Sequence, residues 1–167
     1  MERPLIEANP QVEVFGAYYR ERVMLAWDRD RGPVPGSLAA LKGKPVAVSG
    51  PSLAGWLLAG AEGGMLRESL STQHADGVAA ARALAAGQVA AAAGLASELE
   101  ATLAGQPRYA IVALPTPRAP RAGWVVGCAV KRGSTDLAQA IQQSLTEMTT
   151  GPALREMFGR HGVTWRS

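Results

Sequence analysis

The stretch from Ser37 to Gly60 has the sequence SLAALKGKPVAVSGPSLAGWLLAG, and it holds the signals that decide the fold. Ser37 can cap a short helical turn over Leu38–Leu41, and the valine-rich run Pro45–Ser49 is typical of a buried strand. A Gly-Pro pair then ends the strand, and Ser52 is a suitable N-cap for a helix whose apolar residues recur at helical spacing. A strand that passes through a glycine turn into a capped helix is the repeating unit of α/β folds.

The same alternation extends in both directions along the chain. Upstream, residues 12–19 and 22–27 are expected to be extended, and the charged, Gly/Pro-rich segment Asp28–Gly36 is expected to be a loop. Downstream, further strands are expected at Met65–Leu70, Val89–Ala93, Tyr109–Leu114 and Trp124–Val130. Helices are expected between and after them, beginning near Asp76, Leu95, Ser134 and Gly151. This alternation predicts an α/β fold with a largely parallel sheet.

The composition is that of a globular protein. The 167 residues are enough for one large or two small domains, 47% of them are hydrophobic, and the mean hydropathy is only +0.01. The net charge is +3, but the basic residues are scattered and interleaved with acidic ones. A nucleic-acid-binding surface would need a continuous basic stripe with stacking aromatics, so we expect no nucleic-acid partner. No apolar run is long enough to span a bilayer, and no signal-peptide core follows Met1–Pro4.

Cysteine and histidine are too sparse for a cofactor centre. Cys128 is the single cysteine, so the sequence predicts no internal disulfide, and its place in an apolar strand favours a small buried side chain. His74 and His161 are far apart, and no spacing of Cys, His, Asp or Glu is typical of a metal site. We therefore expect neither a metal nor a cofactor.

Four segments, in their order and spacing, resemble one protein family. They are VFGAYYRERVMLAW (Val14–Trp27), SLAALKGKPVAV (Ser37–Val48), AARALAAGQVAAAAGLAS (Ala80–Ser97) and GCAVKRGSTDLAQAIQQSLTEMTTGPALREMFGRHGV (Gly127–Val163). Together they are similar to the family 3 extracellular solute-binding proteins, which have the type II periplasmic binding protein fold. In that family the first segment is the crossover strand and the second enters the second lobe. The third segment contains a ligand loop, and the fourth holds the closing strand and two helices.

The resemblance implies one complete, doubly wound lobe and the C-terminal part of another. Residues 1–37 would be the crossover and a remnant of the first lobe, residues 38–114 the second lobe with a parallel sheet, and residues 115–167 the returning strand and C-terminal helices of the first lobe. Most of the N-terminal lobe has no counterpart, so the helices would expose the apolar side chains of Leu137, Ile141, Leu145, Met157 and Phe158. A second copy of the chain or a domain swap would cover this surface.

In this fold, ligands bind between the lobes, at the C-terminal ends of strands and the N-termini of helices. By resemblance, Gly50, Ser52 and Leu53 occupy such a position, where Ser52 and free helix amides would hold an anion such as a carboxylate. Ser71 and Thr72 would offer hydroxyl groups at the end of the next strand. Purely structural roles for these residues stay open, because Ser52 caps its helix in either case and hydroxyl groups in loops are often only solvated.

The expected ligand loop, Gly94–Ser97, departs from the family pattern. Leu95 lies about where amino-acid-binding members place an aspartate for the ligand's ammonium group, and Gly94 precedes it. An unpaired ammonium group in a closed cleft would cost several kcal/mol, so the sequence favours a small polar or anionic ligand. Tyr18, near the crossover, would line the cleft or pack in the hinge. Arg3 is the only basic residue near the position of the family's carboxylate-binding arginine.

The resemblance implies a binding subunit of an ABC-type importer, which works with a permease in the periplasm or another extracytoplasmic space. An alternative is an accessory protein of a periplasmic quinoprotein dehydrogenase, whose relatives carry a similar Tyr-Tyr-Arg (Tyr18–Arg20) and Asp-Arg-Gly (Asp30–Gly32). A degenerate interaction module without ligand is a further alternative. We expect no enzyme, because Glu98 and Glu100 fall on a helix whose leucines face inward, which would turn both carboxylates outward.

Overall fold

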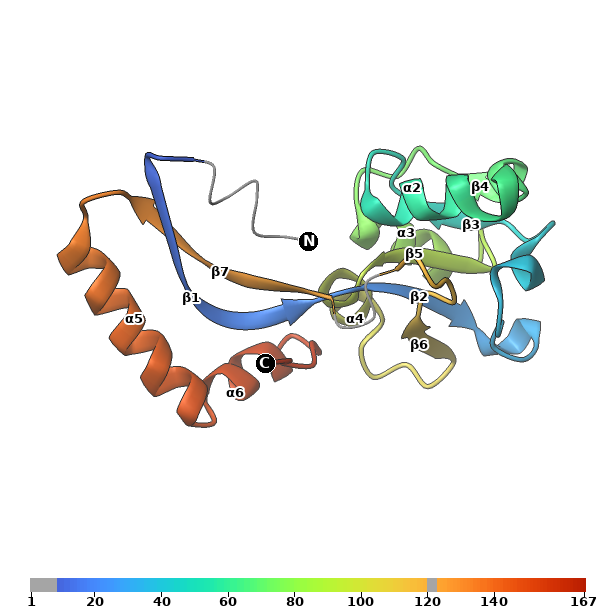
Figure 1. The fold of residues 1–167 in the computed structure, drawn as a ribbon. Helices are drawn as coiled ribbons and strands as arrows, with labels where there is room; N and C mark the ends of the chain where they lie inside the picture. The colour runs from blue at the N-terminus through green and yellow to red at the C-terminus, as the bar shows by residue number, and fades with distance from the viewer. Residues whose placement is uncertain (1–8, 120–122) are drawn as a thin grey trace. The chain divides into compact units, whose positions relative to one another are not determined.

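A computed structural model of the chain describes residues 9–119 and 123–167, and its contacts divide the chain into two compact units (Figure 1). The large unit contains residues 22–119, 123 and 161–163. The small unit contains residues 9–21, 124–160 and 164–167. The lobe boundaries expected from the sequence, after residues 37 and 114, remain predictions about the functional lobes.

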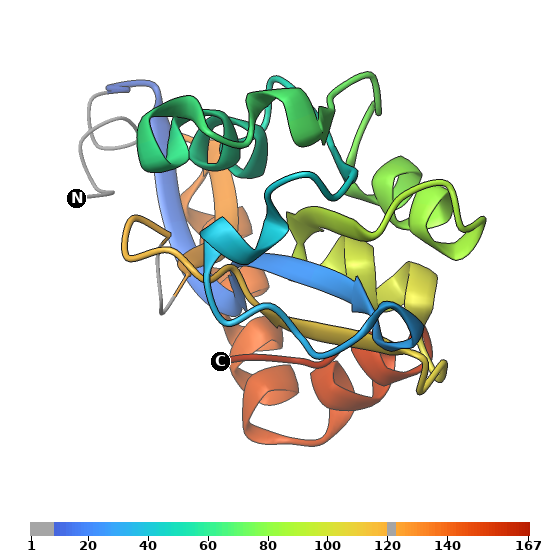
Figure 2. The same ribbon diagram turned by 90° about the vertical axis from the view of Figure 1, so that its right-hand side faces the viewer.

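The large unit is built on a five-stranded sheet with the order β4-β3-β5-β2-β6. In chain order its strands are β2 (Val23–Asp28), β3 (Val46–Val48), β4 (Leu70–Ser71), β5 (Ala91–Leu95) and β6 (Tyr109–Ala113). β3 pairs in parallel with β4 and β5, whereas β2 pairs antiparallel with β5 and β6. The expectation of a largely parallel sheet holds for β3, β4, β5 and β6, which point the same way, while β2 runs against them and makes the sheet mixed (Figure 2). An apolar run such as Val23–Trp27 indicates burial on both faces but carries no information about strand direction.

Helices close both faces of this sheet. They are α2 (Leu53–Gly60), α3 (Gly77–Ala85) and α4 (Ala96–Leu103). One buried cluster joins Met24, Ala26 and Ala92 of the sheet to residues of α3 and α4. Because side chains alternate along a strand, Leu25 and Trp27 point to the opposite face, which α2 covers. The predicted α/β fold is confirmed, with a three-layer core in the large unit.

Two expected strands of the large unit have different bounds. The segment Met65–Leu70 is mostly a 3-10 turn, Arg67–Ser69, and only Leu70–Ser71 pairs as a strand. Arg67 Nε donates to the carbonyl of Ala59 at 3.1 Å, which holds the chain in this turn. The strand expected at Val89–Ala93 lies two residues later, as β5, because Val89 and Ala90 form the buried approach to it.

The small unit is a two-stranded antiparallel sheet with helices. β1 (Val12–Glu21) pairs with β7 (Trp124–Lys131), and α5 (Thr135–Thr150) packs on β1 and is followed by α6 (Ala153–Gly159). Gly16 has a positive φ of +64°, and a Cβ there would lie 2.6 Å from Leu145 Cδ1, so a glycine is needed where α5 approaches β1. The ring of Tyr19 stacks on Phe158 with 4.7 Å between centroids.

Much of the apolar surface of the small unit is uncovered. The predicted exposure of Leu137 and Met157 is confirmed, at 55% and 46%, whereas Ile141, Leu145 and Phe158 are half-buried. Cys128 is half-buried rather than buried, because it lines a hollow of about 310 Å³ on β1 and β7. In the described ranges, no helix is both long and apolar enough to cross a membrane.

Candidate functional site

The sheet topology brings the predicted ligand-binding residues of the large unit to one edge. β3, β4 and β5 point the same way, so their C-terminal ends lie together. Gly50, Ser52 and Leu53 follow β3, Ser71 and Thr72 end or follow β4, and Gly94 and Leu95 end β5. We call this the ligand edge. Whether these residues contact a ligand remains a prediction.

The turn between β3 and α2 is tightly built. Gly50 donates its N–H to the carbonyl of Thr72 at 3.2 Å, and a Cβ on Gly50 would lie only 3.3 Å from the same oxygen. The Ser52 hydroxyl donates to the carbonyl of Ser49 at 2.6 Å and accepts from the N–H of Gly55 at 3.0 Å. Ser52 is therefore a helix cap, as predicted, and its one hydroxyl proton is already used. An anion at this turn would have to bind the backbone amides of the first turn of α2.

The segment after β4 brings in a histidine that the sequence analysis did not select. Ser71 Oγ lies 3.1 Å from His74 Nε2, and Ser49 Oγ donates to the carbonyl of Ala75 at 3.2 Å. Ser71 is half-buried and Thr72 is exposed. His74 thus orients the predicted hydroxyl group. The spacing of three positions between Ser71 and His74 is the only sequence signal for this contact.

The expected ligand loop after β5 does not exist. β5 ends at Leu95 and α4 begins at Ala96, whose N–H donates to the carbonyl of Arg22 at 3.0 Å. Gly94 is buried in the sheet opposite Met24, and Leu95 is half-exposed at the strand end. The loop was expected because β5 was placed two residues too early along the chain.

The orientation expected for Glu98 is wrong. Its carboxylate turns back toward the end of β5, where Oε2 accepts the N–H of Leu95 at 3.0 Å. The same oxygen would collide with a Cβ on Gly77, and a Cβ on Gly94 would lie 2.9 Å from Gly77 Cα. Two residues without side chains therefore make room for this carboxylate at the ligand edge. A glutamate three residues after a strand end is a capping-box signal that leucine periodicity alone did not reveal.

Arg22 is a second charged residue that the sequence analysis missed. It precedes β2, whose first residue, Val23, pairs with Leu95 at the ligand edge. A hollow of about 460 Å³ is lined by Arg22, Val23, residues 113–117 and Ala119. The ligand edge of the large unit therefore carries both a carboxylate and a guanidinium group.

The remaining sequence candidates lie elsewhere. Tyr18 belongs to β1 of the small unit, where its carbonyl accepts a hydrogen bond from Trp165 Nε1 at 2.8 Å. Arg3 lies outside the described residues. Across residues 9–119 and 123–167, no group of three or more His, Cys, Asp or Glu side chains is arranged to hold a metal ion.

The strongest electrostatic feature of the large unit lies at the opposite sheet edge. Asp28 is fully buried, and Arg108 donates to its two carboxylate oxygens at 2.9 and 2.6 Å. These hydrogen bonds hold the pKa of Asp28 below its ordinary value, with help from the N–H of Asp30, although burial alone would raise it. The pair anchors the end of β2 to the start of β6, which is a structural role.

No family model and no curated protein matches the chain. Solved structures do match it. An ancestral cationic amino acid solute-binding protein has a TM-score of 0.70 at 12% identity, over 93% of this chain and 64% of its own. An L-arginine-bound substrate-binding protein of an amino acid ABC transporter from Streptococcus pneumoniae has a TM-score of 0.64 at 17% identity, over 93% and 62%.

The L-cystine solute receptor of Neisseria gonorrhoeae, in its unliganded open conformation, has a TM-score of 0.63 at 17% identity, over 98% of this chain and 64% of its own. The chain therefore has the fold of solute-binding proteins, as the resemblance implied. It spans less than two thirds of the length of each of these receptors.

Proposed function

We propose that this chain is the binding part of a solute-binding protein of an ABC-type importer, which holds a small polar or anionic molecule without transforming it. The observation that carries the proposal is the ligand edge of the large unit. There a side chain on Gly77 or Gly94 would collide with its neighbours, Gly50 lies close to the carbonyl of Thr72, and three strands end beside helix N-termini. Similarity of fold to three amino-acid receptors supports the same role.

The chemistry of the edge favours a polar solute with both donors and acceptors. The backbone amides of Leu53 and Ala54 belong to the first turn of α2, where the end of a helix suits a carboxylate or another anion. Ser71 and His74 add hydroxyl and imidazole groups. The Glu98 carboxylate beside Leu95 supplies the negative charge that residue 95 lacks, so amino acids belong among the candidate ligands.

The proposed partners follow from the role. A permease would receive the solute, and the protein would act in the periplasm or another extracytoplasmic space. The uncovered faces of α5 and α6, around Leu137 and Met157, would be buried by a second copy of the chain or by a domain swap.

A second candidate is an accessory protein of a periplasmic quinoprotein dehydrogenase, or an interaction module without ligand. Two observations favour it over a receptor. The Ser52 hydroxyl proton is bonded within its own turn, and an apolar side chain, Leu95, ends β5. Both are features of an edge that needs no solute.

A thermal-shift screen against amino acids, dicarboxylates and polyamines separates the candidates. A solute present at about 100 times its Kd should stabilise the folded protein by roughly 2.7 kcal/mol. Glu98→Gln should weaken the binding of a solute that carries an ammonium group. Glu62 is an exposed carboxylate elsewhere in the large unit, so Glu62→Gln should leave binding unchanged. If none of the solutes stabilises the protein, the receptor role is contradicted and the second candidate is favoured.

A further inference from the structure

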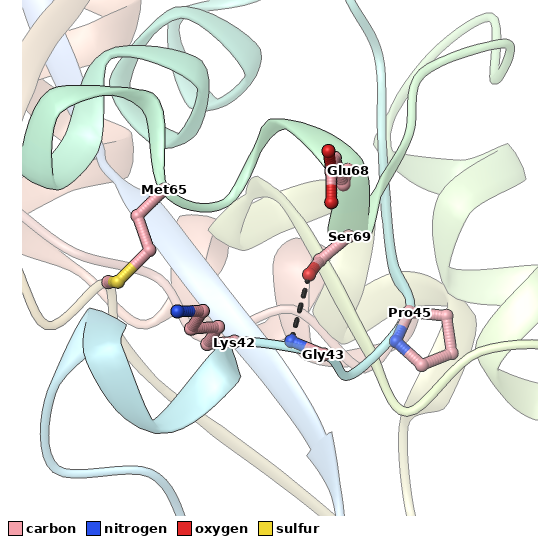
Figure 3. A pocket seen from close by; sticks show the side chains of 6 residues that line it. All are labelled: Lys42, Gly43, Pro45, Met65, Glu68 and Ser69. Atoms are coloured by element: carbon pink, nitrogen blue, oxygen red, sulfur yellow. Dashed lines mark hydrogen bonds between the residues drawn. The ribbon is translucent and has the colours of Figure 1, made fainter.

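A second hollow lies in the large unit, away from the ligand edge. It has a volume of about 360 Å³, within the range of small-molecule sites, and is lined by Lys42, Gly43, Pro45, Met65, Glu68 and Ser69 (Figure 3). These residues precede β3 and β4, so the hollow lies at the N-terminal ends of these strands. The ligand edge is at their C-terminal ends, and the two sites are thus on opposite edges of one sheet.

The walls of this hollow are fixed by the fold. Gly43 donates its N–H to Ser69 Oγ at 3.0 Å, which joins the segment before β3 to the turn before β4 (Figure 3). Leu41 and Leu66, which flank the lining segments in the sequence, are both fully buried. A hollow whose two walls are tied together and anchored in the core is present before any ligand arrives, so binding needs little reorganisation.

The two walls carry opposite charges. Lys42 belongs to the segment before β3, and Glu68 belongs to the 3-10 turn before β4. Within residues 9–119 and 123–167, neither side chain has a hydrogen-bond or ion-pair partner. Met65 adds an apolar side chain beside Lys42 (Figure 3). The hollow therefore offers one cation, one anion and an apolar contact to the same small volume.

We propose that this hollow binds a small zwitterion, with the carboxylate of the ligand at Lys42 Nζ, its ammonium group at the Glu68 carboxylate and its methylene groups against Met65. The Ser69 hydroxyl accepts from Gly43 and can donate its proton to the same ligand carboxylate. A ligand with both charges gains at each end, whereas a singly charged analogue leaves one side chain unpaired. The site is independent of the ligand edge and of the function proposed for it.

The test uses the whole chain labelled with ¹⁵N and amide chemical shifts as the readout. The probes are a series of ω-amino acids from β-alanine to 6-aminohexanoate, with hexanoate and hexylamine as singly charged controls. We expect millimolar binding that shifts the amide signals of Gly43 and Ser69, and that weakens as salt is added. Shifts at Gly50 and Gly94 instead would place the probe at the ligand edge and overturn the proposal.

Charge variants identify the groups that bind. Because each contact is exposed, Lys42→Gln and Glu68→Gln should each lower the affinity for the tightest-binding probe by about three- to fivefold. The exchanged pair Lys42→Glu with Glu68→Lys keeps both charges, so the probe should bind in reverse and recover most of its affinity. Arg82→Gln, an exposed cation on α3, is the matched control and should change nothing.

Three results would overturn the proposal. The first is that the singly charged controls bind as tightly as the zwitterions. The second is that the exchanged variant folds but does not recover affinity. The third is that none of the probes shifts the amide signals of Gly43 or Ser69. The fold of each variant is checked by the dispersion of the remaining amide signals. A receptor role at the ligand edge would survive all three results, because that role is tested separately, by shifts in the amide signals of Gly50 and Gly94.

Discussion

The large and the small unit contain similarly apolar strands but differ in how much of that surface is covered. β2 of the large unit is buried at every residue, because helices lie on both faces of its sheet. β7 of the small unit alternates between half-buried and exposed residues, although its sequence, WVVGCAVK, has apolar or small residues on both faces up to the terminal Lys131. Val125 on its open face is 51% exposed. An apolar strand therefore shows what a chain needs to bury, and the neighbouring elements decide whether it is buried.

The sharpest test of this contrast compares two leucines in helices. Leu58 in α2 is fully buried, whereas Leu137 in α5 is 55% exposed. Leu58→Ala should lower the free energy of unfolding by about 3 kcal/mol, because it removes core contacts and leaves a cavity. Leu137→Ala should change it by less than about 0.5 kcal/mol. Urea unfolding of both variants measures this, and equal losses would mean that Leu137 is covered in solution.

A smaller effect is expected at the ion pair that closes the large unit. Arg108→Gln leaves the buried Asp28 carboxylate without its cation, so the urea midpoint should fall, though less than for Leu58→Ala because Arg108 is itself half-exposed. The folded pKa of Asp28 is below its ordinary value, so the pair stabilises the fold above pH of about 4. That contribution is lost as the pH falls through the lowered folded pKa.

The pH profile therefore distinguishes the ion pair from packing. The natural protein should lose stability steeply below pH of about 4, and Arg108→Gln should show a shallower slope there. Arg82→Gln serves as the control, since that guanidinium is exposed on α3. The same slope in all three proteins would refute a stabilising role for the pair.

The smallest expected effect concerns the small unit alone. Phe158→Leu removes the ring contact with Tyr19 and should cost about 1 kcal/mol. Hydrogen exchange at β1 and β7 amides should then speed up by about fivefold, while β5 amides of the large unit keep their rates. Equal acceleration in both units would show that they unfold together.

The sequence was sufficient for the order of elements and for most helix starts. Ser52 and Asp76 cap α2 and α3 as predicted, because a capping side chain acts on its own turn. The direction of β2 was missed, since parallel and antiparallel pairing require the same apolar residues. The turn at Arg67–Ser69 was missed because a contact with Ala59, eight residues earlier, holds it.

The candidate site was predictable where it depends on chain order and not where it depends on contacts between segments. Gly50 and Ser71 were expected beside the ends of β3 and β4 and lie there, whereas Gly94 was expected in a loop and lies inside β5. Their contact with a ligand remains a prediction. Glu98 was misjudged because its orientation depends on Gly77, which belongs to another helix. β5 was expected two residues too early, and this shift alone predicted a loop where the strand in fact continues directly into α4.

The reversed direction of β2 makes the large unit a module with adjoining ends. Met24 near the start of β2 pairs with Ala113 at the end of β6, so the chain enters and leaves this sheet at neighbouring points. A domain whose ends adjoin can be inserted into another chain, removed from it or closed by a short linker without crossing its core. Residues 22–119 hold all five strands of this unit in one continuous stretch, which recombination or protein engineering could exchange together with its contacts to residues 161–163.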